Sequence, residues 1–447
     1  MGDSKGEASA RIPAAGDNMR WPVVILLSFG MIIAYFDRVN LTVALPEMAK
    51  DFDWSKTQQG LAMSAIFWTY TAFQIPSGIL VDRVGVRMPY FIGFLLWSVA
   101  STVTAFVPAI SSLVGGISST LGIVTTAAVT TLVALMSIRL LVGLGESVVT
   151  PSSMRYIRMH FDERERGLAV GLYMTGTKLG PALGFPVCAY LVAAYGWQSM
   201  FLVIGLVSLI WLVPWMTWVK KDDAAAVSAE KRQALNASAA SATVSTKQIM
   251  KSPVIWGVII GTYCYMYFVY YCMTWMPIYF KERHGMSIKE MGWYGGVAFA
   301  GMAAVAALSG AAADWFIRRG HDPINVRKGF TLAGFLLAST QTIAAYTESV
   351  NVMLFFAVFS LCGLGLATAN YWALTQTLIP GGKIAMVVGV QNTAANLAGI
   401  VSPALTGWMI QQTGSFDAPI KGIGLWLALA MAAYVFLVRR KYAPAAD

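Results

Sequence analysis

Five charged residues lie inside long apolar segments of this sequence, and they are the strongest candidates for chemistry. Asp37 and Arg38 are adjacent in one apolar run, Arg139 and Glu146 share a second, and Lys178 lies in a third. A charge at the centre of a membrane helix costs about 2.5–3.5 kcal/mol on insertion scales. Such side chains therefore face a partner or a water-filled cavity, and function is the default expectation for them.

Two carboxylates and three cations in apolar surroundings suit anion binding coupled to proton transfer. An arginine presents a planar fork that matches a carboxylate, which makes Arg38 and Arg139 candidate anion ligands, together with Lys178. Burial favours the neutral form of a carboxyl group, whereas a nearby arginine favours the ionised form, so Asp37 and Glu146 are candidate proton carriers. Competition between the anion and Glu146 for an arginine would couple the two events. The alternative is that these charges form static ion pairs between helices.

Helix geometry constrains where these side chains point. Arg139 and Glu146 are seven residues apart, so they share one helix face at a separation of roughly 10 Å along the axis. Asp37 and Arg38 diverge by about 100° and cannot point along the same line. We expect both arginines to face a central cavity.

Composition identifies the elements that must position these residues. Of 447 residues, 57% are hydrophobic and 12% are charged, and the mean hydropathy is +0.61. These values are too apolar for a soluble domain and indicate an all-α membrane protein. The net charge of +10 does not indicate nucleic-acid binding, because the basic residues cluster in short loops between apolar runs.

A spanning helix needs about 20 mainly apolar residues. The sequence predicts twelve such helices, at 20–45, 57–81, 88–108, 129–153, 167–194, 198–219, 253–280, 290–316, 328–347, 351–379, 384–411 and 421–438. They divide into two pseudo-symmetric six-helix bundles. The predicted organisation is a disordered tail at 1–19, bundles at 20–219 and 253–440 joined by a polar linker at 220–252, and a short tail at 441–447.

The distribution of Lys and Arg sets the predicted orientation. With both termini inside, 23 of the 32 basic residues lie in inner segments, six lie in outer loops and three lie in the membrane. This bias predicts cytoplasmic termini.

Residues from about 109 to 128 belong to none of the twelve predicted spans and carry no charge. A thirteenth span here would move every later loop to the opposite side of the membrane. We therefore expect a re-entrant or interfacial segment, or an extended fourth helix, on the outer side.

A motif of two glycines, an aspartate and two arginines lies at the end of the second predicted span. Its members are Gly78, Asp82, Arg83, Gly85 and Arg87. Glycines allow close helix approach and a tight turn, and the aspartate can accept hydrogen bonds from a neighbouring helix N-terminus. The second half contains a weaker copy, with Asp314 and Arg318. An internal repeat of this kind is typical of two-bundle transporters, in which it acts as a gate.

This pattern resembles the signature of the major facilitator superfamily. A closer resemblance, over essentially the whole chain, is to its anion:cation symporters, such as galactonate, glucarate and hexuronate transporters. The segments that carry it are 35–40, 139–146, 161–167, 273–277 and 396–403. The resemblance implies a transporter that imports organic anions together with protons. We expect the anion to be a sugar acid or related carboxylate, and the protein to act as a monomer in a bacterial inner membrane.

Further candidate substrate contacts are polar and aromatic side chains at mid-span. They are Tyr35, Tyr70, Thr177, Tyr263, Tyr267, Asn370, Trp372, Asn392 and Asn396. An aromatic stripe also serves packing, and asparagines either bind substrate hydroxyls or join helices, so both readings stay open.

The sequence offers no nucleophile–base set, phosphate loop or metal cluster, so we expect neither an enzyme nor a cofactor. Two rival functions remain. The first is an organic anion exchanger, because the segment from Gly176 to Gly184 contains the glycine–proline pair that is associated with antiporters. The second is a membrane receptor that senses an anion without transporting it. A cationic drug exporter is disfavoured by three cations against two acids.

Overall fold

The computed structural model describes residues 19–220, 246–379 and 384–443, and all regular structure in these ranges is helical. Residues 1–18, 221–245, 380–383 and 444–447 lie outside this description. The predictions for the N-terminal tail, for most of the linker and for the last residues of the C-terminal tail fall there and stay predictions.

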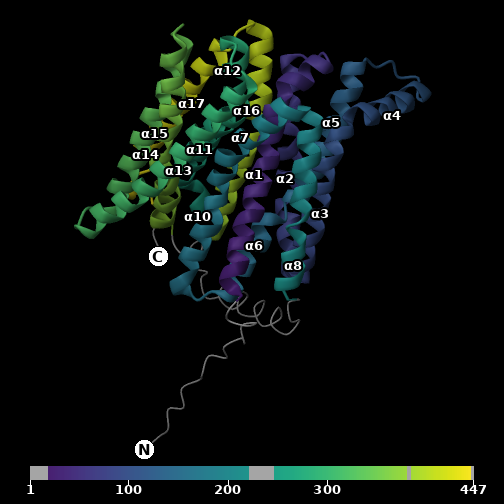
Figure 1. Ribbon diagram of the computed structural model, residues 1–447. Coiled ribbons are helices and arrows are strands. Elements are labelled where there is room, and N and C mark those ends of the chain that lie inside the picture. Colours follow the sequence, from purple (N-terminus) through teal and green to yellow (C-terminus); the bar gives the residue numbers. More distant parts are fainter. Residues whose placement is uncertain (1–18, 221–245, 380–383, 444–447) are drawn as a thin grey trace, which may run out of the picture.

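The helices of the N-terminal half are α1 (Arg20–Asp51), α2 (Lys56–Val84), α3 (Arg87–Val103), η1 (Thr104–Phe106), α4 (Val107–Thr120), α5 (Ala127–Glu146), α6 (Val149–His160), α7 (Glu163–Leu209) and α8 (Leu212–Trp218). Those of the C-terminal half are α10 (Thr246–Lys251), α11 (Pro253–Thr274), α12 (Met276–His284), α13 (Ile288–Arg318), α14 (Pro323–Ser339), η2 (Thr340–Ala345), α15 (Val350–Leu378), α16 (Ile384–Thr413), α17 (Asp417–Phe436) and η4 (Arg440–Tyr442). The long helices run side by side (Figure 1). Below, the α8 end means the end of the bundle where α8 and α10 lie, and the α12 end is the opposite one.

Eight helical stretches among the described residues are long and apolar enough to cross a membrane. They cover nine of the twelve predicted spans, because one of them, 164–218, contains two. The other three spans correspond to α2, to α14 with η2, and to α16, which pack against these stretches. A bundle of this length and composition is that of a multi-pass membrane protein.

Local sequence signals explain where several helices begin and turn. Ser55 caps α2 and Ser287 caps α13, each in a capping box with Gln58 or Glu290 three residues on. These are the second long helices of the two halves, so the repeat extends to their starts. Within α7 the chain turns at Gly196, whose φ of +81° is readily available only to glycine, and this turn separates the fifth and sixth predicted spans.

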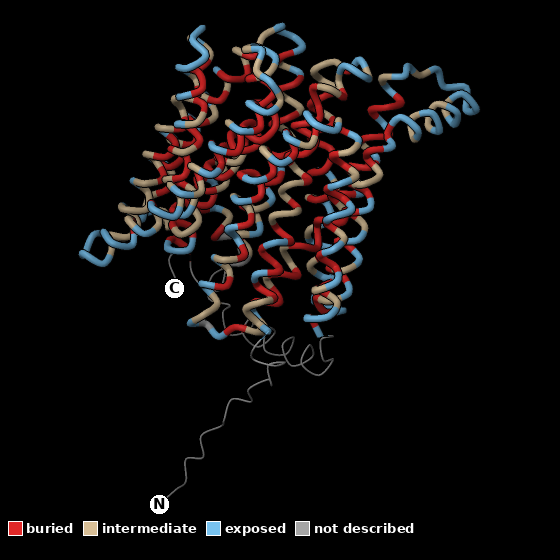
Figure 2. The backbone as a smooth tube through the Cα atoms, in the orientation of Figure 1, coloured by how far each residue is buried: buried red, intermediate tan, exposed pale blue. Residues whose placement is uncertain are grey.

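The two halves meet through α2 with α16 and through α7 with α13. Glycines allow these helices to approach closely. A side chain at Gly60 of α2 would collide with the Pro403 carbonyl of α16, and one at Gly292 of α13 would collide with Phe185 of α7. Buried residues concentrate along these contacts and in the centre of each half (Figure 2).

The segment that the twelve spans left over forms an arm at the α12 end. α4 continues from α3 and projects sideways from the bundle before the chain returns to α5 (Figures 1 and 2). No residue from Pro108 to Val129 is buried. The arm does not run through the bundle. Its helix continues the third predicted span rather than the fourth, so the expected extension of the fourth helix is wrong, and the placement of the arm on the outer side of a membrane stays a prediction.

Single cysteines at Ser112 and Thr126 test whether the arm crosses the membrane. Because both positions lie at the α12 end, we expect an impermeant thiol reagent to label both from one side, or neither. The four native cysteines, at 188, 264, 272 and 362, are replaced first. Labelling of one position from each side of the membrane would show that the arm spans it.

Candidate functional site

The four charged residues of the first two pairs meet where α1 packs near α5. Arg38 and Glu146 form an ion pair in which Glu146 Oε2 accepts from Arg38 Nε at 3.0 Å and from Nη2 at 2.9 Å. Both side chains are almost fully buried, at 7% and 1% exposed. Glu146 Oε1 has no hydrogen-bond partner among the described residues. The carboxylate thus leaves one oxygen unused beside a buried cation.

Aromatic rings enclose the Arg38 guanidinium. Its Cζ atom lies 4.7 Å from the ring centres of both Tyr35 and Tyr70, and 5.6 Å from that of Phe67. A ring face attracts a cation, most strongly where water is excluded. These rings stabilise the guanidinium without using its N–H groups, which stay available to a carboxylate.

Asp37 lies in a separate hydrogen-bond cluster. Its Oδ1 atom accepts from Asn40 Nδ2 at 2.9 Å and from the Ser101 hydroxyl of α3. Its Oδ2 atom is buried and has no partner among the described residues. Arg139 Nη1 donates to the main-chain oxygen of Asp37 and Nη2 to Asn40 Oδ1, both at 2.9 Å. Arg139 therefore ties α5 to the central turn of α1.

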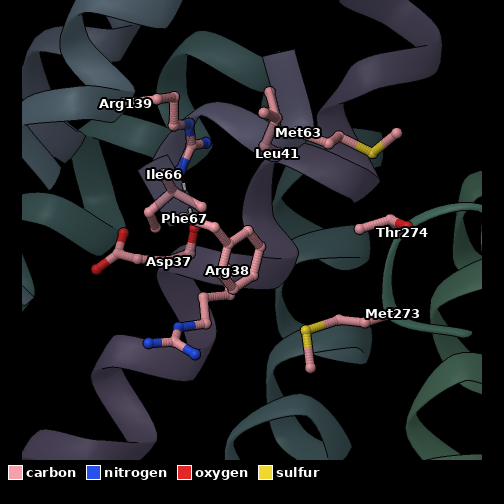
Figure 3. Close-up of a pocket in the computed structure, with 9 residues that line it drawn as sticks. All are labelled: Asp37, Arg38, Leu41, Met63, Ile66, Phe67, Arg139, Met273 and Thr274. Atoms are coloured by element: carbon pink, nitrogen blue, oxygen red, sulfur yellow. Dashed lines mark hydrogen bonds between the residues drawn. The ribbon is translucent and has the colours of Figure 1, made fainter. Parts of the chain in front are cut away.

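Asp37 and Arg38 belong to different clusters because consecutive helical side chains diverge by about 100°. Figure 3 shows the two guanidinium groups pointing in different directions, with Met273 and Thr274 of α11 across the space from Asp37. Both arginines line this pocket, whose lining residues are Asp37, Arg38, Leu41, Met63, Ile66, Phe67, Arg139, Met273 and Thr274. Glu146 lies on the same face of α5 as Arg139. It does not pair with Arg139 but with Arg38 of α1.

Lys178 differs from the other four charges. It is half-buried on α7 and makes no hydrogen bond or ion pair within residues 19–220, 246–379 and 384–443. The neighbouring Thr177 hydroxyl donates its hydrogen to the Met174 carbonyl of its own helix at 2.8 Å, so this hydrogen is already engaged within α7. Among the described residues, Lys178 is thus the cation of this set with neither an ion pair nor a hydrogen bond, whereas Arg139 at least bonds to neutral oxygens of α1.

The C-terminal half offers polar groups without charge. α11, α15 and α16 contain no Asp, Glu, Lys or Arg. Asn392 and Asn396 of α16 each donate an amide hydrogen to Oε1 of Gln74 on α2, at 2.8 and 2.9 Å. Asn370 donates to Leu366 O, while its buried Oδ1 atom has no partner among the described residues.

The sequence analysis missed Gln74 and Ser101. Gln74 lies one helical turn after Tyr70, and its Nε2 atom donates to the Tyr70 hydroxyl at 3.4 Å. A polar residue in an apolar span was the available signal for it. Ser101 carried no such signal, because a serine in a membrane helix commonly bonds to its own backbone.

The predicted tyrosine stripe of α11 divides between two environments. The rings of Tyr263 and Tyr267 pack against Trp426 of α17, with centres 5.5 and 5.2 Å apart, and neither lines the pocket. Further along the helix, Tyr270 packs against Phe67 of α2 at 4.6 Å. Trp372 packs beside Tyr371 on α15. Of the two readings left open for these aromatic residues, packing on α17 applies to Tyr263 and Tyr267 in this structure, and their role as substrate contacts stays a prediction.

The motif after α2 connects helices at the α8 end. α2 ends at Val84, and Gly85 follows with φ +92°. Asp82 accepts from Arg155 Nη1 of α6 at 3.0 Å, where a helix N-terminus had been expected as its partner. Arg87 donates to Met216 O of α8 at 2.7 Å.

The copy of the motif in the second half is less complete. Asp314 accepts from Arg327 of α14 at 3.0 Å. The arginine of the copy, Arg318, is exposed, and so is Arg83 of the first-half motif. Gly78, also of the first-half motif, lies close to Pro151 of α6. The ion pairs Arg20–Glu165, Arg155–Asp82 and Arg327–Asp314 at the α8 end each stay within one half.

Two ion pairs at the α12 end join the halves crosswise. Lys56 of α2 pairs with Glu282 of α12, and Lys281 of α12 donates to Glu47 Oε1 of α1 at 2.6 Å. The Lys56 main-chain N–H also donates to Gln411 of α16 at 2.9 Å. We call Glu47, Lys56, Lys281 and Glu282 the cross-half ion pairs. They hold the two halves together at the end opposite to α8.

Within the three described ranges, no three His, Cys, Asp or Glu side chains are grouped so that they could hold a metal ion.

Comparison with known proteins gives a consistent result. Residues 27–403 match the family model described as Major Facilitator Superfamily. The chain is 26% identical to a probable galactarate/D-glucarate transporter of Escherichia coli K12, with 95% of each chain covered. It is 27% identical to a D-galactonate transporter of another Escherichia coli strain, with 94% of this chain and 95% of the relative covered.

A solved structure shares the fold. The inward-open xylose transporter XylE of Escherichia coli superposes with a TM-score of 0.71 at 14% identity, over 95% of this chain and 96% of that one. The predicted fold class, two pseudo-symmetric helix bundles, is confirmed by this likeness and by the family match.

Proposed function

The chain belongs to the Major Facilitator Superfamily and is a membrane transporter rather than an enzyme, and from this premise we propose that it imports a small organic anion together with protons. The proposed substrate is a sugar acid or a related carboxylate. The proposed setting is a bacterial inner membrane, with the α8 end on the cytoplasmic side and the protein acting as a monomer. The buried Arg38–Glu146 pair, with an unused carboxylate oxygen, is the observation that carries this proposal.

The distribution of charge between the halves supports the substrate class. The N-terminal half supplies every buried charge of the pocket, and α11, α15 and α16 supply uncharged hydrogen-bonding groups. A sugar acid has the matching asymmetry, with a carboxylate at one end and hydroxyl groups along its length. Its carboxylate would bind Arg38, and its hydroxyl groups would reach Asn392, Asn396 or Asn370.

Proton coupling follows from the partner of Arg38. While Glu146 is ionised, it occupies two N–H groups of the guanidinium. A proton on Glu146 removes the charge that holds Arg38, and the guanidinium becomes available to the substrate. Asp37 is the second proposed proton site, because its Oδ2 atom is buried without a partner among the described residues.

The contacts of Arg139 refine its proposed role. Two of its N–H groups are bound by Asp37 O and Asn40 Oδ1, and the residue is 2% exposed. We therefore assign the substrate carboxylate to Arg38 first, and to Arg139 the positioning of Asp37 and a supporting positive charge. Lys178 is proposed to meet a second anionic or polar group of the substrate.

Transport requires the two halves to separate at one end and then at the other. The cross-half ion pairs close the α12 end and must break when that end opens. We expect Glu282→Lys to destabilise the closed state, because it places a lysine opposite Lys56. A cysteine at Thr274, in the pocket lining, should then be labelled from the α12 side at least fivefold faster than in the parent.

The exchanged pair Lys56→Glu with Glu282→Lys is the control for this prediction. It restores opposite charges at the same positions, so the labelling rate should return to within about twofold of the parent. A single variant that labels no faster than the parent would show that these ion pairs do not hold the end closed.

Proteoliposomes test the proposed function directly. A thermal-shift screen with D-galactonate, galactarate and D-glucarate first selects the carboxylate that stabilises the purified protein most. Uptake of that compound should increase when the lumen is made alkaline relative to the outside, and a protonophore should abolish the accumulation. Binding without any uptake would identify a receptor instead.

Anion exchange is the second candidate. The glycine–proline segment of α7 packs closely against α1 through Gly176, Gly180 and Gly184. This packing explains the glycines in a symporter, and it is equally compatible with an exchanger. Counterflow that is unaffected by a proton gradient, with no net uptake, would favour exchange over symport.

A further inference from the structure

Gln74 joins the two halves next to the charged pocket. Its Oε1 atom accepts amide hydrogens from Asn392 at 2.8 Å and from Asn396 at 2.9 Å, and both donors belong to α16. Its Nε2 atom donates to the Tyr70 hydroxyl. Because the amide nitrogen is engaged by Tyr70, the carbonyl end faces α16. One oxygen atom of the N-terminal half therefore holds two amide groups of the C-terminal half.

Tyr70 connects this bridge to the proposed substrate ligand. Its ring centre lies 4.7 Å from Arg38 Cζ, and Arg38 is bound to Glu146. A continuous series of contacts thus runs from Glu146 through Arg38, Tyr70 and Gln74 to α16. An anion that engages Arg38 is in a position to disturb the bridge.

Two amide N–H groups that converge on one point form a site for an oxygen acceptor. Leaving such groups buried without an acceptor is unfavourable, so this contact between α2 and α16 needs an oxygen atom whether or not substrate is bound. Asn396 is 4% exposed, which leaves little access for water. A sugar acid carries suitable oxygen atoms, and in their absence Gln74 supplies one from the chain itself.

We propose that Gln74 takes the place of a substrate oxygen in the empty carrier and so allows the empty carrier to reorient. This inference rests on the proposed function. A symporter has to return without substrate after each cycle, whereas an exchanging carrier changes orientation only when loaded. Gln74 is in this scheme a positioning residue, which the substrate displaces from Asn392 and Asn396 on binding.

The test compares net uptake with counterflow in Gln74→Leu, which keeps an extended side chain and removes the amide. With the carboxylate selected by thermal shift, net uptake should fall at least tenfold, while counterflow stays within threefold of the parent. Substrate affinity should rise about threefold, because an internal competitor is removed. If this variant is not recovered as a monodisperse protein, Gln74→Asn, whose shorter amide does not span the gap, is measured in the same way.

Gln391→Leu is the matched control. Gln391 is buried on the same helix as the two asparagines, but its amide donates to Thr262 at 3.0 Å within the C-terminal half. Its loss should change net uptake and counterflow by the same factor.

Equal losses of net uptake and counterflow in Gln74→Leu, or a weaker substrate affinity, would overturn the inference. A parent protein that shows counterflow without gradient-driven uptake would refute the proposed symport instead. In that case the substrate affinity of Gln74→Leu tests whether Gln74 competes with the substrate. Tighter binding than in the parent supports this competition, and unchanged or weaker binding refutes it.

Discussion

Arg38→Ala is expected to weaken substrate binding by about 2–5 kcal/mol, which is the usual result of truncating one member of a buried charge pair. This corresponds to a loss of affinity between about 30-fold and several thousand-fold. The reason is twofold: the substrate carboxylate loses its guanidinium ligand, and Glu146 keeps a buried charge without its partner. Isothermal titration of the purified variant with the selected carboxylate measures the effect.

Two further variants locate the cause. Arg38→Lys retains the charge but loses the planar fork, so its affinity should lie between those of the parent and Arg38→Ala. Arg139→Gln should lower the melting temperature, because Arg139 bonds to the α1 backbone, and should reduce affinity less than Arg38→Ala does. The opposite order, with Arg139 essential and Arg38 dispensable for binding, would reverse the assignment of the two arginines.

Asp37→Asn and Glu146→Gln are expected to abolish accumulation driven by a proton gradient, because each amide imitates a permanently protonated carboxyl group. Counterflow should survive in at least one of them, since it needs substrate binding but no net movement of protons. In the parent, a proton on Glu146 frees Arg38, so substrate affinity should rise as the pH falls. In Glu146→Gln this pH dependence should be lost.

The control for this pair is Glu165→Gln. Glu165 is a carboxylate that pairs with Arg20 at the start of α1, far along the helix from the pocket. This variant should keep gradient-driven accumulation and the pH dependence of the parent. Full accumulation in both Asp37→Asn and Glu146→Gln would show that neither carboxylate carries the coupled proton.

The cross-half ion pairs and the Gln74 bridge connect the two halves at two different places. The ion pairs lie at the α12 end, while the bridge connects the halves beside Arg38. The Lys56–Glu282 pair and the Gln74 bridge both start from α2, which packs against α16, whereas the Lys281–Glu47 pair joins α12 to α1.

Much of the fold could be predicted from the sequence, because a membrane helix is specified locally. About twenty apolar residues are needed to span hydrocarbon, and charged loops separate the runs, so the spans could be placed to within a few residues. The turn at Gly196 and the starts at Ser55 and Ser287 also follow from local chemistry. The arm at 109–128 was recognised only as a segment that the spans did not require.

The members of the candidate site could also be predicted, since a charged side chain in hydrocarbon is costly and stands out. Their partners could not. The divergence of Asp37 and Arg38 follows from helix geometry, but it does not say which acid Arg38 meets. Glu146 lies 108 positions further along the chain, and Arg139 on the same helix face bonds to the α1 backbone instead.

The sequence by itself determined the apolar spans, their division into two halves and the five charges within them, because each is a property of a short segment in a hydrocarbon environment. Only the tertiary structure decided which arginine is held by a carboxylate, which is held by the backbone, and that Gln74 meets two asparagines more than 300 positions away. The physical reason is that hydrogen bonds and ion pairs depend on contacts within a few ångströms. Those contacts are set by how α1, α2, α5 and α16 pack, and sequence spacing within any one helix does not contain that information.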